Sequence, residues 1–221
     1  MTEPTETHAL AATTEVGGDA ILDLARGGDW RTLAALGRFG LAVQTLRLAE
    51  GVDADVDMLD TLQGLTEVEI SVRSKSLARA RKRFAAIERR PDDLIPWDDV
   101  AADLESLAVA VPAVDSRDLP EAREALAALR SDVFTAERDA LLGTVAVLEG
   151  DQASGLAAFE AALARDPNHV RAWTNRGNLR LEAGDVDGAI GDYERALKLD
   201  DSFANAHHNL GVAYRRKGQV G

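Results

Sequence analysis

The residues that could carry out acid–base, nucleophilic or metal chemistry are scattered along this 221-residue chain rather than grouped. The chain has no Cys, so it has neither a thiol nucleophile nor a cysteine-based zinc site. Of its four His, the neighbours His207 and His208 point about 100° apart on a helix, whereas zinc ligands on one helix prefer a spacing of four. No GxSxG, GxxxxGK or HExxH pattern occurs. We therefore expect no enzymatic activity, no metal site and no cofactor.

An acidic run at residues 52–64 contains Asp53, Asp55 and Asp57, which superficially resemble a calcium-binding loop. The central glycine and the closing glutamate of such a loop are not at the required offsets. The run is therefore interpreted as a short acidic helix.

A basic stretch follows this run in a chain whose net charge is −13. Residues 73–90 hold eight basic residues and one acidic residue. They belong to a single helix predicted over residues 66–90, and the alternative for its β-branched start, Val68–Val72, is a strand. The basic face, comprising Lys75, Arg79, Lys82 and Arg83, lies opposite an apolar stripe. It is interpreted first as a solvated face or one paired with the acidic flanks, and second as a surface for an acidic protein. Nucleic acid is the least favoured partner, because no aromatic residues are interleaved and the overall charge is repulsive.

A repeat with a period of 34 residues runs through the C-terminal part of the chain. Gly150, Gly184 and Gly218 share this interval. The same interval separates Gly143, Gly177 and Gly211, and the pairs Leu156 and Ile190, Phe159 and Tyr193, Ala162 and Ala196, Leu163 and Leu197, and Asp166 and Asp200. So many matching residues at a 34-residue interval indicate helix–turn–helix units stacked into a solenoid. Its small residues allow close approach of helices, and its large residues fill the space between them.

The unit from Val170 to Phe203 resembles a tetratricopeptide repeat. Signature positions are held by Trp173, Gly177, Gly184, Asp185, Ala189, Ile190, Tyr193, Ala196 and Leu197. The unit from Ala136 to His169 is similar, and a partial unit begins at Ala204. The resemblance implies an all-α fold, a right-handed α-solenoid of antiparallel helix hairpins. It also implies a non-enzymatic scaffold for protein–protein interaction that binds a peptide or protein.

Two local features of these units carry further expectations. The pairs Gly150-Asp151 and Gly184-Asp185 would turn the chain, because Gly relieves left-handed strain and Asp is favoured at a helix start. Arg176 and Arg180 depart from the family pattern, so this face of the helix is expected either in water or beside an acidic group.

The family resemblance also implies a concave groove lined by the first helix of each unit. The expected partner-binding residues are Arg171, Thr174, Asn178, Leu181, Glu182, Asn205, His208, Val212 and Arg215, and Glu137, Ala140 and Thr144 would line the groove in the preceding unit. Asn178 matches an asparagine that some family members use to hold a peptide backbone or terminal carboxylate, although Asn is also simply common there. The cationic clamp of chaperone-binding relatives is absent, because its positions hold Ala140, Thr144, His208 and Val212. We therefore do not expect recognition of chaperone tails.

The whole chain divides into four predicted segments. They are a disordered acidic tail (1–18), an N-terminal helical segment with the basic helix at 73–90 (19–90), a degenerate helical hairpin (91–135) and the repeat units (136–169, 170–203 and 204–221). In the degenerate hairpin, a helix starting at Trp97 is predicted to end near Pro112 and the next to span Leu119–Ser131. These upstream helices are needed as stacking partners, because about three units are required for a stable solenoid.

The composition, 46% apolar and 29% charged, is ordinary for a soluble folded protein. No apolar run approaches the roughly 20 residues that span a bilayer, and the first residues lack a secretion signal, so a cytoplasmic location without membrane insertion is expected. The helix predicted from residue 204 is interpreted as a solvating cap. The alternatives are a longer natural chain, or a second subunit that covers its face and makes the protein a self-assembling homo-oligomer.

Overall fold

The computed structural model describes residue 33 and residues 39–50, 56–87 and 95–220, and all regular structure within these residues is helical. The helices are α3 (Phe39–Glu50), α4 (Val56–Arg73), α5 (Leu77–Ala86), α6 (Trp97–Ser116), α7 (Leu119–Ala127), α8 (Thr135–Leu148), α9 (Gln152–Arg165), α10 (Val170–Glu182), α11 (Val186–Leu199) and α12 (Ala204–Val220). The predicted all-α solenoid is thereby confirmed as the fold class. The predicted acidic tail at 1–18 lies outside the described residues.

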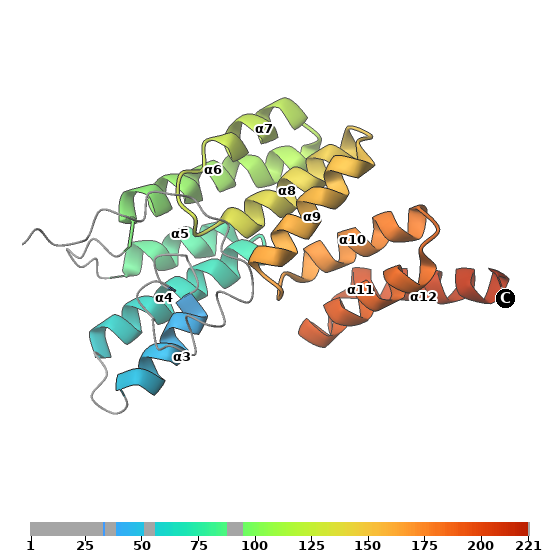
Figure 1. The fold of residues 1–221 in the computed structure, drawn as a ribbon. Coiled ribbons are helices and arrows are strands. Elements are labelled where there is room, and N and C mark those ends of the chain that lie inside the picture. Colours follow the sequence, from blue (N-terminus) through green and yellow to red (C-terminus); the bar gives the residue numbers. More distant parts are fainter. Residues whose placement is uncertain (1–32, 34–38, 51–55, 88–94, 221) are drawn as a thin grey trace, which may run out of the picture.

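The helices pair into hairpins that follow one another through space from α3 to α12, as Figure 1 shows. α4 packs on α5, α6 on α7, α8 on α9, and α10 on α11. α8 contacts α6 and α7 on one side and α10 on the other, so it joins the upstream hairpins to the repeat units. α12 packs on α10 and α11 at the far end of the array.

Buried apolar side chains form three clusters along the array. The largest runs from Leu33 through α3 to α7 and includes Leu141 and Val145 of α8. Smaller clusters surround Phe159, between α8, α9 and α10, and Tyr193, between α10, α11 and α12. The upstream helices therefore provide the stacking surface that the repeat units need, since a single hairpin cannot bury both of its faces.

The predicted Gly-Asp turns are confirmed. Gly150 and Gly184 both have φ of 88°, the left-handed region that glycine adopts without strain. The side chain of Asp151 accepts a hydrogen bond from the Ser154 backbone N–H at 3.0 Å, and Asp185 accepts one from Gly188 N–H at 3.0 Å. Each aspartate thus caps the second helix of its unit.

The prediction of one helix over residues 66–90 is wrong. α4 ends at Arg73, and α5 begins at Leu77 after a tight turn in which Lys75 adopts a left-handed φ of 56°. Residues 56–64 of the acidic run form the first half of α4 rather than a separate short helix, because Leu62, Leu65, Val68 and Val72 make one buried stripe at helical spacing. The alternative of a strand at Val68–Val72 is likewise wrong, since these residues are helical.

The predicted ends of the next two helices also need correction. α6 continues through Pro112 to Ser116, because Pro112 is exposed and buried Val111, Ala113 and Val114 hold the last turn in place. α7 ends at Ala127 rather than at Ser131. The reason is the fully buried carboxylate of Asp103 on α6, which accepts hydrogen bonds from the backbone N–H groups of Arg130 at 2.7 Å and Ser131 at 2.9 Å.

Candidate partner-binding groove

A groove of about 230 Å³ lies along the first helices of the repeat units. Its lining comes from α8, from α10, from the start of α12 and, unexpectedly, from two upstream elements. The lining residues are Lys75, Val114, Asp115, Glu137, Ala140, Leu141, Thr144, Arg171, Thr174, Asn175, Asn178, Phe203, Asn205 and Asn209. Most of these residues carry amide, hydroxyl or charged groups, so the groove offers hydrogen-bonding groups beside its apolar surface.

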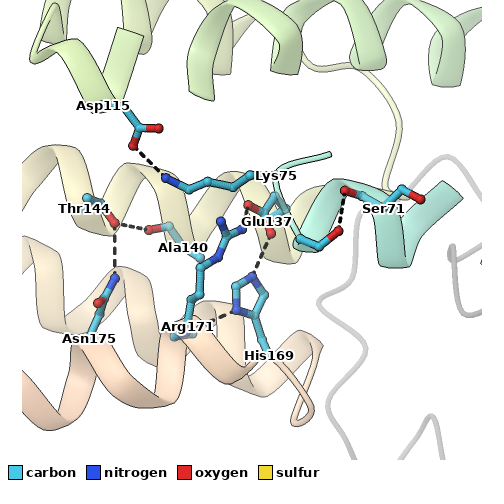
Figure 2. Close-up of polar contacts among 11 residues, drawn as sticks. Ser71, Lys75, Asp115, Glu137, Ala140, Thr144, His169, Arg171 and Asn175 are labelled. Carbon is cyan, nitrogen blue, oxygen red and sulfur yellow. Dashed lines mark hydrogen bonds and ion pairs between the residues drawn. The ribbon is translucent and has the colours of Figure 1, made fainter. Parts of the chain in front are cut away.

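A buried carboxylate, Glu137, forms the floor at one end of the groove (Figure 2). One of its oxygens accepts a hydrogen bond from Nε2 of buried His169 at 3.0 Å, and the other is paired with Arg171. Burial alone would raise the pKa of Glu137, but the His169 hydrogen bond and the Arg171 charge outweigh it, and the pKa lies below its ordinary value. Nδ1 of His169 accepts from the Ala172 N–H at 3.2 Å, which caps α10. This triad ties α8 to the start of α10 and fixes Arg171 at the groove.

Lys75 reaches the groove from the turn between α4 and α5. Its Nζ lies 2.6 Å from Oδ1 of Asp115 on α6, and Figure 2 shows the side chain extended above Glu137 and Arg171. Both members of the pair are exposed, at 39% and 57%, so water and salt weaken their attraction. The Lys75 ammonium can therefore exchange Asp115 for a ligand carboxylate at small cost.

Asparagines line the remainder of the groove. Oδ1 of Asn178 accepts hydrogen bonds from the Tyr193 hydroxyl at 2.8 Å and from Nδ2 of Asn209 at 2.7 Å, which joins α10, α11 and α12. Nδ2 of Asn175 lies 3.4 Å from the Thr144 hydroxyl on α8. The amide nitrogen of Asn178 has no partner among the described residues, so it is available as a donor to a ligand.

The two departures from the repeat pattern, Arg176 and Arg180, lie beside an acidic group. Asp192 of α11 is 2% exposed, and its carboxylate accepts hydrogen bonds from Arg176 at 2.9 and 2.6 Å and from Arg180 at 3.0 Å. The Asp192 hydrogen bonds raise the pKa of Arg176, whose guanidinium also lies 4.6 Å from the centre of the Trp173 ring. Of the two expectations for this face, the acidic neighbour is the one that the structure shows.

The structure places only part of the expected partner-binding set in the groove. Arg171, Thr174, Asn178 and Asn205 line it, together with Glu137, Ala140 and Thr144. Leu181 lies instead in the apolar cluster around Tyr193, and exposed Glu182 accepts a hydrogen bond from Gln152 at 3.1 Å. His208, Val212 and Arg215 are on α12 outside the groove lining, His208 and Arg215 exposed and Val212 against the Tyr193 cluster.

Several groove residues were missed from the sequence. Asn175 and Asn209 are separated by the same 34-residue interval as the glycines, so the repeat period could have identified them. Lys75 and Asp115 carry no such signal, because they precede the clear units and reach the groove only through tertiary packing. The remaining basic-face residues, Arg79, Lys82 and Arg83, are exposed on α5, and Arg83 pairs with Glu67 of α4.

The part of the chain that the structure describes has neither a metal-binding cluster nor a membrane-spanning helix. Among the described residues, no group of three or more His, Asp or Glu side chains is arranged to hold a metal ion. None of the described helices is long and apolar enough to cross a membrane.

Comparison with known families agrees with the helix pairs and their Gly-Asp turns. A family model described as a TPR repeat matches residues 177–218, and one described as a tetratricopeptide repeat matches residues 158–191. Residues 158–218 are therefore tetratricopeptide repeat sequence. Within this range α10 and the start of α12 carry groove residues, and α9 and α11 carry the aromatic residues Phe159 and Tyr193.

Curated relatives match about a third of this chain. A peroxisomal targeting signal receptor of Candida albicans is 36% identical over 61 residues, 28% of this chain and 10% of the receptor. The TPR repeat-containing thioredoxin TTL4 of Arabidopsis thaliana is 28% identical over 78 residues, 35% of this chain and 11% of the relative. Human tetratricopeptide repeat protein 36 is 36% identical over 66 residues, 30% of this chain and 35% of the relative. The chain thus spans about a tenth to a third of the length of these relatives.

Two solved structures are similar to this chain over most of its length. The MamA protein aligns with 72% of this chain and 82% of its own, at 18% identity and a TM-score of 0.45. The TPR domain of P58(IPK) aligns with 89% of this chain and 64% of its own, at 18% identity and a TM-score of 0.44.

Proposed function

We propose that this chain is a non-enzymatic scaffold that binds an extended peptide segment of a partner protein in the concave groove. The observation that carries the proposal is the set of four asparagine side chains that line the groove, at 175 and 178 on α10 and at 205 and 209 on α12. A side-chain amide offers both a donor and an acceptor, the same pair that a peptide group presents, so such a set suits an extended backbone.

The charged residues favour a ligand that carries one acidic group. Arg171 is held rigidly by Glu137, and Lys75 is held loosely by Asp115. An acidic side chain or terminal carboxylate at the upstream end of the groove would therefore draw Lys75 from Asp115, while the amides hold the remainder of the segment. The charge of such a group sets orientation more than affinity.

Peptides selected from a random display library on the intact chain test this proposal. The matched variants are Asn175→Leu with Asn205→Leu in the groove, and Asn168→Leu in the exposed turn between α9 and α10. We expect the groove variant to lose at least about tenfold in affinity, because each lost hydrogen bond contributes about 1 kcal/mol and the apolar replacements leave peptide groups unpaired. Asn168→Leu should bind as the intact chain does. Equal loss in both variants, or no loss in either, would contradict binding in this groove.

A second candidate function is self-assembly through α12, and one observation favours it. A Cβ added at Gly143 would lie 2.7 Å from the Phe159 ring, and one added at Gly177 would lie 2.7 Å from the Tyr193 ring. At the equivalent Gly211, no described atom lies within 4 Å of such a Cβ. The α12 face therefore has space for a helix with an aromatic residue, which a second copy could supply.

Sedimentation velocity over a range of concentrations tests the second candidate. Gly211→Gln should abolish any dimer, because its side chain fills the space above α12. The control Gly191→Gln, at an exposed position of α11, should leave any dimer intact. A chain that stays monomeric at high concentration would exclude self-assembly.

A further inference from the structure

A second groove, of about 700 Å³, lies between α5 and α6, on elements outside the matched repeats. Its apolar lining consists of Leu77 and Ala78 of α5 and Ala108, Val111 and Pro112 of α6. Val111 is buried, whereas Ala78 and Pro112 are exposed, so the lining rises from the core to the surface. Exposed Val109, 44% accessible, follows Glu105 by one helical turn on α6 and extends the apolar surface.

Positive charge borders this apolar lining. Lys75 and Arg81 line the groove, and exposed Lys82 follows Ala78 of the lining by one helical turn on α5. Arg81 pairs with Glu105 at 2.8 Å, but both groups are more than half exposed and the pair is weak. Lys82 has no carboxylate partner among the described residues, in a protein whose net charge is −13.

A backbone acceptor beside this groove lacks its usual helical donor. Pro112 has no N–H, so the carbonyl of Ala108, four residues earlier, lacks its usual helical donor. Ala108 and Pro112 both line the groove, which places this carbonyl at its edge. A ligand with a hydroxyl or amide donor can satisfy it.

We propose that the groove between α5 and α6 is a docking site for an acidic amphipathic segment of a partner protein. Such a segment buries aliphatic side chains against Leu77, Ala108 and Val111 and places carboxylates beside Arg81, which lines the groove, and Lys82, which lies one turn after Ala78 on α5. Nucleic acid fits less well, because the groove lining is aliphatic and offers no aromatic ring for base stacking. The site lies beyond the concave groove, although Lys75 and Asp115 line both.

The test uses a synthetic amphipathic helix of about four turns, with Leu on one face and Glu on the other, and measures its binding to the full chain by fluorescence anisotropy. The charge-reversed variant Arg81→Glu with Lys82→Glu should weaken binding at least about tenfold, because like charges then face the peptide. The matched control, Arg195→Glu with Lys198→Glu, makes the same charge change on exposed positions of α11 and should leave binding unchanged.

Ala108→Arg separates docking from general attraction. It adds a positive charge but fills the apolar lining, so docking in the groove requires weaker binding. A peptide of the same composition with its Leu and Glu shuffled should bind at least about tenfold more weakly, because it cannot present one apolar face. Tighter binding to Ala108→Arg, equal binding of the shuffled peptide, or tighter binding of a single-stranded DNA oligonucleotide would each overturn the proposal.

The two grooves can be distinguished by the same variants. Changes at Arg81 and Lys82 should leave binding of the library-selected peptides intact, and Asn175→Leu with Asn205→Leu should leave binding of the acidic helix intact. Loss of the acidic helix in the asparagine variant would place it in the concave groove and overturn the separate site.

Discussion

Replacing Asp192 by Ala should be among the most destabilising single changes in the repeat units. The carboxylate is 2% exposed and accepts three hydrogen bonds, from Arg176 at 2.9 and 2.6 Å and from Arg180 at 3.0 Å. Removing one member of a buried ion pair typically costs about 3–5 kcal/mol. The two arginines are 14% and 30% exposed and can recover some hydration, so we expect the lower end, about 3 kcal/mol.

Urea unfolding followed by far-ultraviolet circular dichroism measures this loss, and hydrogen exchange locates it. Asp192→Asn keeps the shape and one acceptor oxygen, so it should lose about half as much. Because a repeat array can unfold in parts, exchange should accelerate mainly in α10, α11 and α12 and not in α4 to α7. Asp187→Ala is the matched control, since its pair with Lys217 is 80% and 57% exposed.

One outcome would refute the reasoning. If Asp192→Ala were as stable as Asp187→Ala, the buried cluster would not hold α10 to α11, and Arg176 and Arg180 would be solvated. A uniform loss of protection across all helices would instead show that the array unfolds as one unit.

Three further predictions concern Glu137 and the glycines of the repeat units. The pKa of the Glu137 carboxyl is lowered in the folded chain, so its ionised form stabilises the fold above the ordinary pKa of about 4.3, and this contribution is lost as the pH falls through the lowered pKa. The difference in unfolding free energy between the native chain and Glu137→Gln should therefore be full at about pH 7 and shrink below about pH 4. A difference that stays constant with pH would contradict this. Gly177→Ala should destabilise by about 1–3 kcal/mol, because its Cβ would lie 2.7 Å from Tyr193 Cε1, whereas Gly191→Ala, with open space, should stabilise by about 0.5–1 kcal/mol in thermal unfolding. Gly184→Ala should lower stability by about 1 kcal/mol and Gly184→Asn by less, since φ of 88° rather than crowding is the obstacle; equal losses would contradict the strain argument.

The repeat units were predictable because their signals are local and repeated. A 34-residue interval, a Gly-Asp pair at each turn and alternating small and large residues all depend on contacts within one hairpin or between neighbours. The left-handed glycines and the capping aspartates followed from those pairs alone. Part of the groove followed too, because the first helix of each unit carries Arg171, Asn178 and Asn205.

Upstream helix boundaries were harder to predict, because the competing local signals were misleading. The sequence around Lys75 has no Gly or Pro, so nothing marks the turn that ends α4. Pro112 is a strong stop signal, yet α6 continues past it because burial of Ala113 and Val114 outweighs one lost hydrogen bond. In both places tertiary packing overrides local preference.

Sequence periodicity thus determined the fold class and the repeat register, because both arise from side chains a few residues apart. The tertiary structure alone decided how the charged groups of the groove are paired. It brings Lys75 to Asp115 across 40 residues and sets Glu137 between His169 and Arg171 across more than 30. Such pairs depend on how whole hairpins stack, and no local pattern in the chain encodes that arrangement.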